Sequence, residues 1–481
     1  MPNRARTRRT KIVATIGPAS DAPETLEAML RAGMNVARLN LSHGSFEEHK
    51  ARLLRIRAAA DAVGVPVAIM IDTRGIEIRT GTLAGGPVEL VSGETFSLFT
   101  DGRPGDARGV SVSYKRLPQE VHPGETVLLD DGAMELQVLA TTDREVRCQV
   151  IVGGRLGASK GVNLPGTQLS VTAVDPETRD DVLRELSFAA DNDVEYIAAS
   201  FIQTADEVRR MREMLAEAGV EIPIIAKIEN RAGVANLEEI VQVANGVMVA
   251  RGDLGVELPL ADVPSTQKKI IRTTVSNGKP VITATQMLAS MERNPKPTRA
   301  EASDVANAIL DGSSAVMLSG ETAAGAYPVQ AVRIMAELAI RAEASLREYG
   351  WLQQTLPHPS NVVTEAIAQS AVGMAERLGA AAILSLTETG FTSRLISKHR
   401  PECPILAVTA CLPVARRLAL NWGVVPILYE AGLSDDEKIA LAIRIARERR
   451  LVAPGDVLVA TWGHTQSAGG TDAIRVLTVG E

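Results

Sequence analysis

Cysteine and histidine are scarce in this chain, and their scarcity excludes several kinds of site. The 481 residues include three cysteines, Cys148, Cys403 and Cys411, and six histidines. Because no CxxC pair and no His-rich partner segment occurs, the sequence indicates neither a disulfide framework nor a zinc site. We expect the three thiols to be buried or neutral on the surface.

Long apolar runs and an excess of basic charge are missing as well. No apolar run reaches the roughly 18 residues of a membrane span. The basic residues between Arg4 and Lys11 are not followed by the apolar stretch of a signal peptide, so we interpret them as a solvated tail. The net charge of −7 disfavours nucleic acid or a membrane surface as the main partner. These absences predict a cytoplasmic protein.

The usual nucleotide-binding loops are also absent. The chain has no Walker-type phosphate loop, no dinucleotide-binding glycine pattern after a strand, and no protein-kinase signature set. If the protein binds a nucleotide, it binds it without any of these loops.

What the sequence does contain is a series of eight short apolar runs, each followed by a stretch of helical period. Runs too apolar to alternate, joined by helices, are typical of a parallel sheet that is covered on both faces. Eight such units predict a (β/α)8 TIM barrel. The expected strands are Ile12–Gly17, Val36–Asn40, Val67–Asp72, Tyr196–Ile202, Ile224–Glu229, Gly246–Arg251, Val281–Gln286 and Ala315–Ser319, and the expected helices include Glu24–Ala32, Phe46–Ala62, Pro176–Asp191, Ala205–Ala218 and Glu301–Leu310.

The third and fourth runs are separated by about 120 residues, which predicts an insertion. Residues 1–75 form the first part of the barrel with a short basic arm, and residues 172–346 form the second part. Short alternating segments in residues 76–171 predict a small β-barrel domain that acts as a lid. Residues 347–481 show a new α/β rhythm that predicts a C-terminal, doubly wound regulatory domain with an antiparallel edge pair.

Polar residues follow the predicted barrel strands at the end where TIM barrels build their active sites. Glu229 and Asp253 close neighbouring strands, and two carboxylates without histidine suit Mg²⁺ or Mn²⁺ better than zinc. Arg38 and Lys227 suit a phosphoryl group. Two alternatives stay open: the carboxylates could instead be ion-paired with Lys227 and Arg251, or Lys227 could be a Schiff-base lysine.

Several ordered motifs are similar to those of the pyruvate kinase family. They are 10-TKIVATIGPAS-20, 34-MNVARLNLSHG-44, 160-KGVNLPG-166, 226-AKIEN-230, 248-MVARGDLGVE-257, 284-ATQM-287, 297-PTRAE-301, 303-SDVAN-307 and 317-MLSGET-322. The resemblance covers the barrel, the lid hinges and, more loosely, the third domain. It implies transfer of the phosphoryl group of phosphoenolpyruvate to ADP in glycolysis, giving pyruvate and ATP.

The resemblance also implies residue roles. Glu229 and Asp253 match the Mg²⁺ ligands, Arg38 the phosphate-binding arginine, and Lys227 the lysine that stabilises transfer. Asn40, Ser42, Asp72 and Thr73 match K⁺ ligands, and Glu77 stands where K⁺-independent members carry lysine. Ser200, Ala250, Arg251, Gly252 and Thr285 match the substrate site, with Thr285 implicated in protonating the enolate. Thr15, Pro18, Asn40, His43, Arg79 and Lys160 match the nucleotide side.

The resemblance further implies a homotetramer and a phosphorylated allosteric effector. The turn of Thr387, Thr389, Gly390, Thr392 and Ser393 is similar to an effector loop, and a hydroxyl-rich turn that opens a helix suits an anion. The chain departs from the family at Arg74-Gly75-Ile76, where Lys-Gly-Pro is usual, so we expect a looser lid hinge. Ala289 and Ala302 replace a glutamate and a glycine, which points to subunit contacts.

Two other functions compete with this interpretation. Another phosphoenolpyruvate-using lyase or synthase on a TIM barrel would need Mg²⁺ and phosphate-binding arginines, but neither ADP nor the Lys160 lid. A metabolite-sensing binding protein would keep the loop of the third domain but not the complete set of barrel residues.

Overall fold

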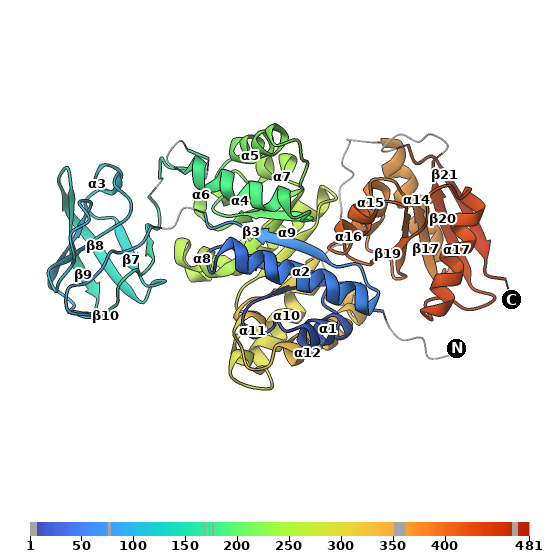
Figure 1. Cartoon of the computed structure of the whole chain (residues 1–481), viewed down its shortest axis with the longest axis horizontal. Coiled ribbons are helices and arrows are strands. Elements are labelled where there is room, and N and C mark those ends of the chain that lie inside the picture. The colour runs from blue at the N-terminus through green and yellow to red at the C-terminus, as the bar shows by residue number, and fades with distance from the viewer. Residues whose placement is uncertain are drawn as a thin grey trace.

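The computed structural model places three bodies in a row, with the barrel in the middle (Figure 1). It describes residues 7–75, 78–167, 169–172, 174–175, 178–350, 362–463 and 470–480. Glu77, the residue tied to K⁺ dependence, lies outside this range. Among the described residues, no helix combines the length and the apolar character needed to cross a membrane.

Eight parallel strands close into a barrel, and all eight strands predicted from the sequence are present. Around the barrel they follow the order β1, β16, β15, β14, β13, β12, β3, β2. The strands are β1 (Lys11–Thr15), β2 (Val36–Asn40), β3 (Ala68–Asp72), β12 (Tyr196–Ala199), β13 (Ile224–Ile228), β14 (Gly246–Ala250), β15 (Val281–Ala284) and β16 (Ala315–Leu318). Nearly every strand residue is buried, because side chains facing inward fill the barrel and side chains facing outward meet helices.

Helices cover the outside of the barrel and cap its ends. Their boundaries follow local signals: Ser45 and Glu48 form the predicted capping box at the start of α2, and Gly33 in left-handed conformation ends α1. The helices are α1 (Pro23–Ala32), α2 (Phe46–Val63), α4 (Arg179–Asp191), α5 (Ala205–Glu217), α6 (Arg231–Ala235), α7 (Leu237–Val243), α8 (Arg251–Glu257), α9 (Val263–Ser276), α10 (Arg299–Leu310), α11 (Gly320–Ala323), α12 (Pro328–Ala344) and α13 (Leu346–Tyr349). Short 3-10 turns lie at Leu260–Asp262 and Ala289–Glu292.

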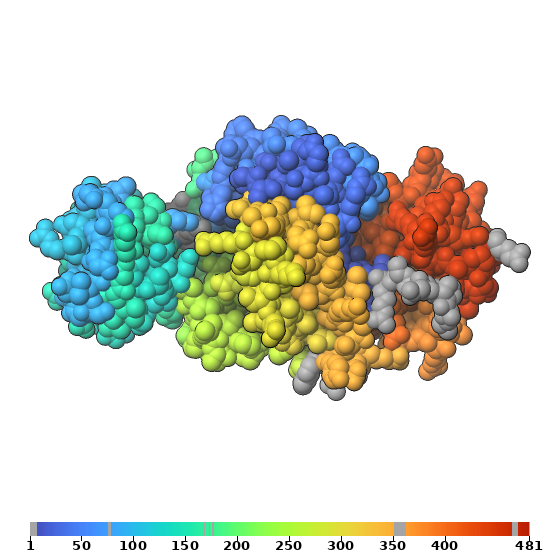
Figure 2. Space-filling model, turned by 90° about the horizontal axis from the view of Figure 1, so that it is seen from below, coloured from blue at the N-terminus to red at the C-terminus, as the bar shows by residue number. Residues whose placement is uncertain are grey.

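The segment between β3 and α4 forms a separate β domain with its own core, here called the inserted domain. Figure 2 shows it as a distinct lobe at one end of the molecule. Its main sheet has six strands in the order β11, β7, β8, β9, β5, β6, and β4 pairs with β10. The elements are β4 (Val88–Leu90), β5 (Thr95–Phe99), β6 (Gly109–Ser111), α3 (Leu117–Glu120), β7 (Thr126–Leu129), β8 (Met134–Thr141), β9 (Glu145–Val152), β10 (Gly154–Leu156) and β11 (Val162–Asn163).

The C-terminal domain is a five-stranded sheet with helices on both faces. The strand order is β19, β18, β17, β20, β21, and the last pair is antiparallel, as predicted. Two separate apolar clusters, one on each face, show the doubly wound packing. The elements are α14 (Val362–Leu378), β17 (Ala382–Leu386), α15 (Phe391–Lys398), β18 (Ile405–Thr409), α16 (Leu412–Leu418), β19 (Val424–Leu428), α17 (Asp435–Glu448), β20 (Val457–Trp462) and β21 (Ala473–Thr478).

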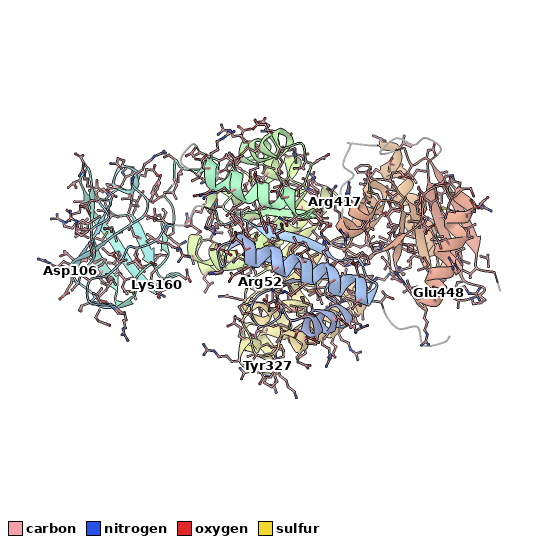
Figure 3. All side chains as sticks on the ribbon, viewed as in Figure 1. Arg52, Asp106, Lys160, Tyr327, Arg417 and Glu448 are labelled. Atoms are coloured by element: carbon pink, nitrogen blue, oxygen red, sulfur yellow. The ribbon has the colours of Figure 1, made fainter. Side chains whose placement is uncertain are left out.

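The C-terminal domain closes the base of the barrel, the end where the strands begin. Ala419 and Leu420, which follow α16, belong to the same buried cluster as the residues inside the barrel. The Tyr196 hydroxyl donates a hydrogen bond to the Arg417 carbonyl across this junction, where Figure 3 labels Arg417. The inserted domain lies beyond the opposite end, here called the mouth (Figure 1). The two ends of the barrel therefore have different neighbours.

Candidate active site

The barrel closure brings polar side chains from distant parts of the chain to the mouth. In the strand register Asn40 lies beside Asp72, and Thr15 lies beside Arg38. Lys227 is at the end of β13, while Ala250 and Ala284 pair at the ends of β14 and β15. Parallel strands that end at one rim account for this assembly, because all their carboxyl ends point the same way.

Asp72 is the centre of a buried ionic network. Its side chain is 1% exposed, and its two carboxylate oxygens face two cations: Arg38 Nε lies 2.6 Å from Oδ2, and Lys227 Nζ lies 3.0 Å from Oδ1. The Ser200 hydroxyl donates to the Thr73 carbonyl at 2.6 Å and accepts from Lys227 at 2.7 Å. Burial opposes the charge of Asp72, but the two cations outweigh burial and lower its pKa.

Lys227 also contacts Glu229, as two residues on one face of a strand should. Its ammonium lies 2.9 Å from Glu229 Oε1. Burial by itself would lower the pKa of Lys227, but Asp72 and Glu229 raise it above its ordinary value. A Schiff-base lysine must lose its proton, so this environment disfavours that alternative.

The buried Glu229 and the partly buried Asp253 form a second group beside Lys227. Asp253 shares a hydrogen bond with Glu229, and burial together with the Glu229 charge raises the pKa of Asp253 to about 7. Glu229 is held from the other side by the Phe201 backbone N–H, which donates to Oε2 at 2.6 Å. Two carboxylates that share a proton in a buried site are well suited to a cation.

The loop after β15 has an unusual backbone. Thr285 and Gln286 have φ angles of 64° and 54°, in the left-handed region that residues with a Cβ seldom adopt. The Thr285 hydroxyl accepts from the Gly252 N–H at 2.8 Å and donates to the Ala284 carbonyl at 2.7 Å. The strained turn therefore fixes Thr285 against the backbone at the end of β14.

The Arg251 guanidinium is engaged outside the carboxylate pair. It lies 2.7 Å from Asp304 of α10 and donates to the carbonyls of Ala284 and Thr285. The alternative in which Arg251 neutralises Glu229 or Asp253 is therefore wrong, and only its Lys227 half is found. The side chain of Arg251 is thus turned away from the two carboxylates. Its backbone lies at the mouth, next to the backbone of Ala250 and Gly252.

The four residues matched to K⁺ ligands lie at the ends of β2 and β3. Asn40 Oδ1 accepts from the Ser42 N–H at 3.2 Å, and Thr73 Oγ1 accepts from the Ser200 N–H at 3.1 Å. Thr73 is joined to the Asp72 network through Ser200, which also contacts Lys227.

The residues assigned to the nucleotide side are not all brought together. Thr15 is close to Arg38, whose Nη1 donates to its hydroxyl at 2.9 Å. Pro18 and His43 are exposed at the rim. Arg79 and Lys160 belong to the inserted domain, where Arg79 donates to the Ser159 carbonyl at 2.9 Å and Lys160 pairs with Asp130 at 2.9 Å. Lys160 lies on the barrel-facing part of this lobe (Figure 3).

The predicted effector turn separates into buried and exposed residues. The Ser393 hydroxyl is fully buried and donates to Ser385, and Thr392 shares a hydrogen bond with Thr471. Thr387 accepts from the Gly390 N–H at 2.9 Å, which leaves Thr389 as the exposed hydroxyl of the set.

Three residues that were not among the predicted site residues position this site. Phe201, with φ 56°, donates to Glu229, and Asp304 holds Arg251. Glu185 of α4 accepts from the Arg74 N–H at 3.3 Å at the start of the inserted domain, and burial raises its pKa to about 7. Their roles depend on contacts with distant segments, although Asp304 lies inside the motif 303-SDVAN-307.

Known proteins share both the barrel and the C-terminal domain with this chain. Family models for the pyruvate kinase barrel domain and the pyruvate kinase alpha/beta domain match residues 7–332 and 365–477. The pyruvate kinases of Bacillus licheniformis and Geobacillus stearothermophilus are each 46% identical to it, over 477 and 478 residues, which is 98% of this chain and 81% of each relative. The pyruvate kinase of Staphylococcus aureus strain MRSA252 is 44% identical over 477 residues, with the same coverage.

Fold and site together define a TIM-barrel phosphotransferase. The similarity over almost the whole chain is more specific, and the chain belongs to the pyruvate kinase family. Its activity is the transfer of a phosphoryl group from phosphoenolpyruvate to ADP in glycolysis, which yields pyruvate and ATP.

Lys227→Met tests the ionic network at the mouth. The substitution leaves Asp72 and Glu229 buried without their shared ammonium, so we expect a loss of about 3–5 kcal/mol of unfolding free energy. Turnover should fall by a factor of roughly 100 or more if Lys227 has the role that the family resemblance implies, the stabilisation of charge during transfer. Thermal and urea unfolding with steady-state kinetics measure the two effects. Lys268→Met, which removes a half-exposed ion pair with Asp311, is the control and should change stability by less than about 1 kcal/mol. Equal stability of the two variants would contradict the role of Lys227.

Proposed function

We propose that the mouth of the barrel carries out this transfer through the cations around Asp72. Arg38 and Lys227 are held in place before substrate arrives, and their charges suit the oxygens of the phosphoryl group in flight. The backbone of Ala250, Arg251 and Gly252 receives the enolpyruvate part, with Ser200 beside it. The observation that supports this most is the pairing of both cations with one buried carboxylate, at 2.6 and 3.0 Å.

Glu229 and Asp253 would hold Mg²⁺, or Mn²⁺ in its place. The two carboxylates lie close enough to share a hydrogen bond, and both offer the oxygen ligands that this ion prefers. Mg²⁺ accepts one or two protein carboxylates and completes its shell with water and substrate oxygens. When bound, the ion supplies positive charge beside the transferring group.

Thr285 is our candidate for orienting the group that protonates the enolate. The transfer leaves an enolate that must gain a proton at carbon, and Thr285 is fixed beside the Gly252 backbone. Because its hydroxyl already donates to the Ala284 carbonyl, that hydrogen bond must rearrange before Thr285 can donate elsewhere.

Nucleotide binding at this site requires a movement of the inserted domain. Thr15, Pro18, Asn40 and His43 would contact ADP from the barrel, and Arg79 and Lys160 from the inserted domain. Lys160 is paired with Asp130 in the structure, so closure must exchange that ion pair for the ADP phosphates. Closure would also exclude water from the transfer.

Formation of pyruvate with and without ADP separates this function from its main rival. A kinase forms pyruvate from phosphoenolpyruvate only when ADP is present, and ATP appears in equal amount. Formation of another phosphoenolpyruvate-derived product, independent of ADP, would instead support a lyase or synthase on the same barrel.

The proposed metal site predicts a pH-dependent Mg²⁺ affinity. With its pKa raised to about 7, Asp253 holds a proton that must leave when the ion binds. Affinity should therefore rise with pH and level off above about 7, and below this value it should fall roughly tenfold per unit. Calorimetric Mg²⁺ titrations measure this in wild type, and Asp253→Asn should bind weakly at every pH.

Glu229→Gln should also weaken Mg²⁺ binding, while circular dichroism shows an intact barrel. A wild-type Mg²⁺ response in both variants would remove the two residues from the metal site.

A K⁺ requirement is the second cofactor proposal. Asn40, Ser42, Asp72 and Thr73 offer oxygens suited to a large monovalent cation, and Glu77 stands where K⁺-independent relatives carry an ammonium. Activity should fall sharply when a large organic cation replaces K⁺ at constant ionic strength, which separates binding from screening. Glu77→Lys should reduce this sensitivity. Equal wild-type rates in the two salts would show that the oxygens hold no essential ion.

The remaining expectations rest on the family resemblance. A phosphorylated effector at the turn of residues 387–393 would meet Thr389 and backbone N–H groups, because Thr392 and Ser393 are buried. The homotetramer and the cytoplasmic location stay predictions.

A further inference from the structure

A cluster of cations lies at the base of the barrel, where the C-terminal domain docks. Arg8, Arg9 and Lys11 come from the segment that enters β1, and Arg400 follows α15. All four lie near the same carboxylate, Glu343 of α12, whose side chain is 3% exposed. Four cations therefore surround one carboxylate, and the cluster carries an excess of positive charge.

Burial disfavours the charged form of three of these four groups. Burial is the largest cause in each case, and it lowers the pKa of Arg8 to about 10, of Lys11 to about 7 and of Arg400 to about 9. Lys11 finds an acceptor in the Val424 carbonyl at 2.6 Å, and Arg8 one in Asn35 at 2.8 Å. Carbonyl and amide oxygens satisfy donors but do not neutralise charge, so among the described residues Glu343 is the carboxylate that all four cations share.

Arg400 is the member of the cluster with unmet hydrogen-bonding capacity. Its Nη2 donates to the Gly312 carbonyl at 2.7 Å and to the Ser314 hydroxyl at 3.1 Å. Its Nε and Nη1 are buried and have no hydrogen-bond partner among the residues that the structure describes. Unmet buried donors are costly in a folded protein, and a charged donor costs more.

Both the backbone conformation of Arg400 and the stacking of its side chain on Trp422 fix its position. Its φ of 52° is left-handed, which a residue with a Cβ adopts only when its surroundings impose it. Its guanidinium lies 4.6 Å from the centre of the Trp422 ring, and the Arg9 guanidinium lies 5.1 Å from the same centre. The two arginines are therefore held close together before any ligand binds.

A cavity of about 980 Å³ adjoins this pair. Arg9, Glu343, Arg400 and Trp422 line it, together with parts of α12, α13 and α14, so it lies between the barrel and the C-terminal domain. Two further arginines, Arg347 and Arg450, line it as well, and the carboxylates of Glu376 and Glu402 match them in number. Arg347 pairs with Glu402 at 2.9 Å. This volume is within the range of about 300–1,000 Å³ that is typical of small-molecule sites.

We propose that this cavity is a second anion site, which takes the phosphate group of a small phosphate monoester between Arg400 and Arg9. A phosphate dianion brings negative charge to a cavity whose four arginines outnumber its three glutamates, and its oxygens suit the fork of a guanidinium. The site is separate from the mouth of the barrel and from the turn of residues 387–393. Because its residues come from both domains, an occupied site strengthens the contact between them.

Trp422 provides a direct readout for this proposal. The chain has three tryptophans, so Trp351→Phe combined with Trp462→Phe leaves Trp422 as the single emitter. In this background we titrate inorganic phosphate against chloride at constant ionic strength. Emission should change along a saturating curve, because the guanidiniums beside the ring move onto the anion, and the thermal midpoint should rise in parallel. A linear change would mean that phosphate does not bind at this site and would overturn the proposal.

Charge variants in the same background locate the site. Arg400→Gln should weaken phosphate binding tenfold or more, and Glu343→Gln should tighten it several-fold because the excess charge increases. Arg444→Gln, on the exposed face of α17, is the matched control and should bind phosphate like the parent. If Arg400→Gln fails to fold, Arg400→Lys keeps a charge without the fork and should give intermediate binding. Thr389→Asp tests the turn: loss of binding in that variant, with Arg400→Gln unaffected, would place the phosphate there and overturn the assignment.

Discussion

The buried carboxylate of Asp72 is the interaction on which the mouth of the barrel depends. It holds Arg38 and Lys227 at 2.6 and 3.0 Å, and both cations come from other strands. Without it, two desolvated positive charges would repel each other in a site of low dielectric. With it, they stay charged and fixed, and in the proposed function the phosphoryl group meets donors that need no further ordering. The neighbouring pair of Glu229 and Asp253 is less well compensated, which is the condition that favours a bound cation.

The strand pattern and the charged residues at the strand ends could be predicted from sequence because both follow local rules. An apolar run has few options other than a buried strand, and the carboxyl ends of parallel strands meet at one rim. The closeness of Lys227 and Glu229 follows from the two-residue period of a strand. Such reasoning needs no knowledge of distant contacts, and the structure places all eight strands as expected.

Other features depend on contacts that no local pattern reveals. The charge of Arg251 suggested a partner at the mouth, but the guanidinium turns to Asp304 on α10, which lies 53 residues further along the chain. The hydroxyl-rich turn suggested five effector-binding residues, yet the packing of α15 buries Thr392 and Ser393. The docking of Leu420 under the barrel was equally out of reach, since a leucine after a helix is compatible with many neighbours. In each case tertiary packing decided where the side chain points.

The two ends of the barrel present opposite electrostatic situations on the same set of strands. At the mouth, carboxylates and cations alternate, and positive charge is lacking beside Asp253. At the base, guanidiniums outnumber the carboxylate of Glu343, and negative charge is lacking beside Arg400. Strand β1 belongs to both ends, since Lys11 begins it and Thr15, the partner of Arg38, ends it. Five strand residues span only about 13 Å from first to last, so an anion at the base would lie one short, fully buried strand away from the proposed phosphoryl site. A barrel built in this way can bind anions at both ends while its core stays apolar, because the charges are confined to the strand termini.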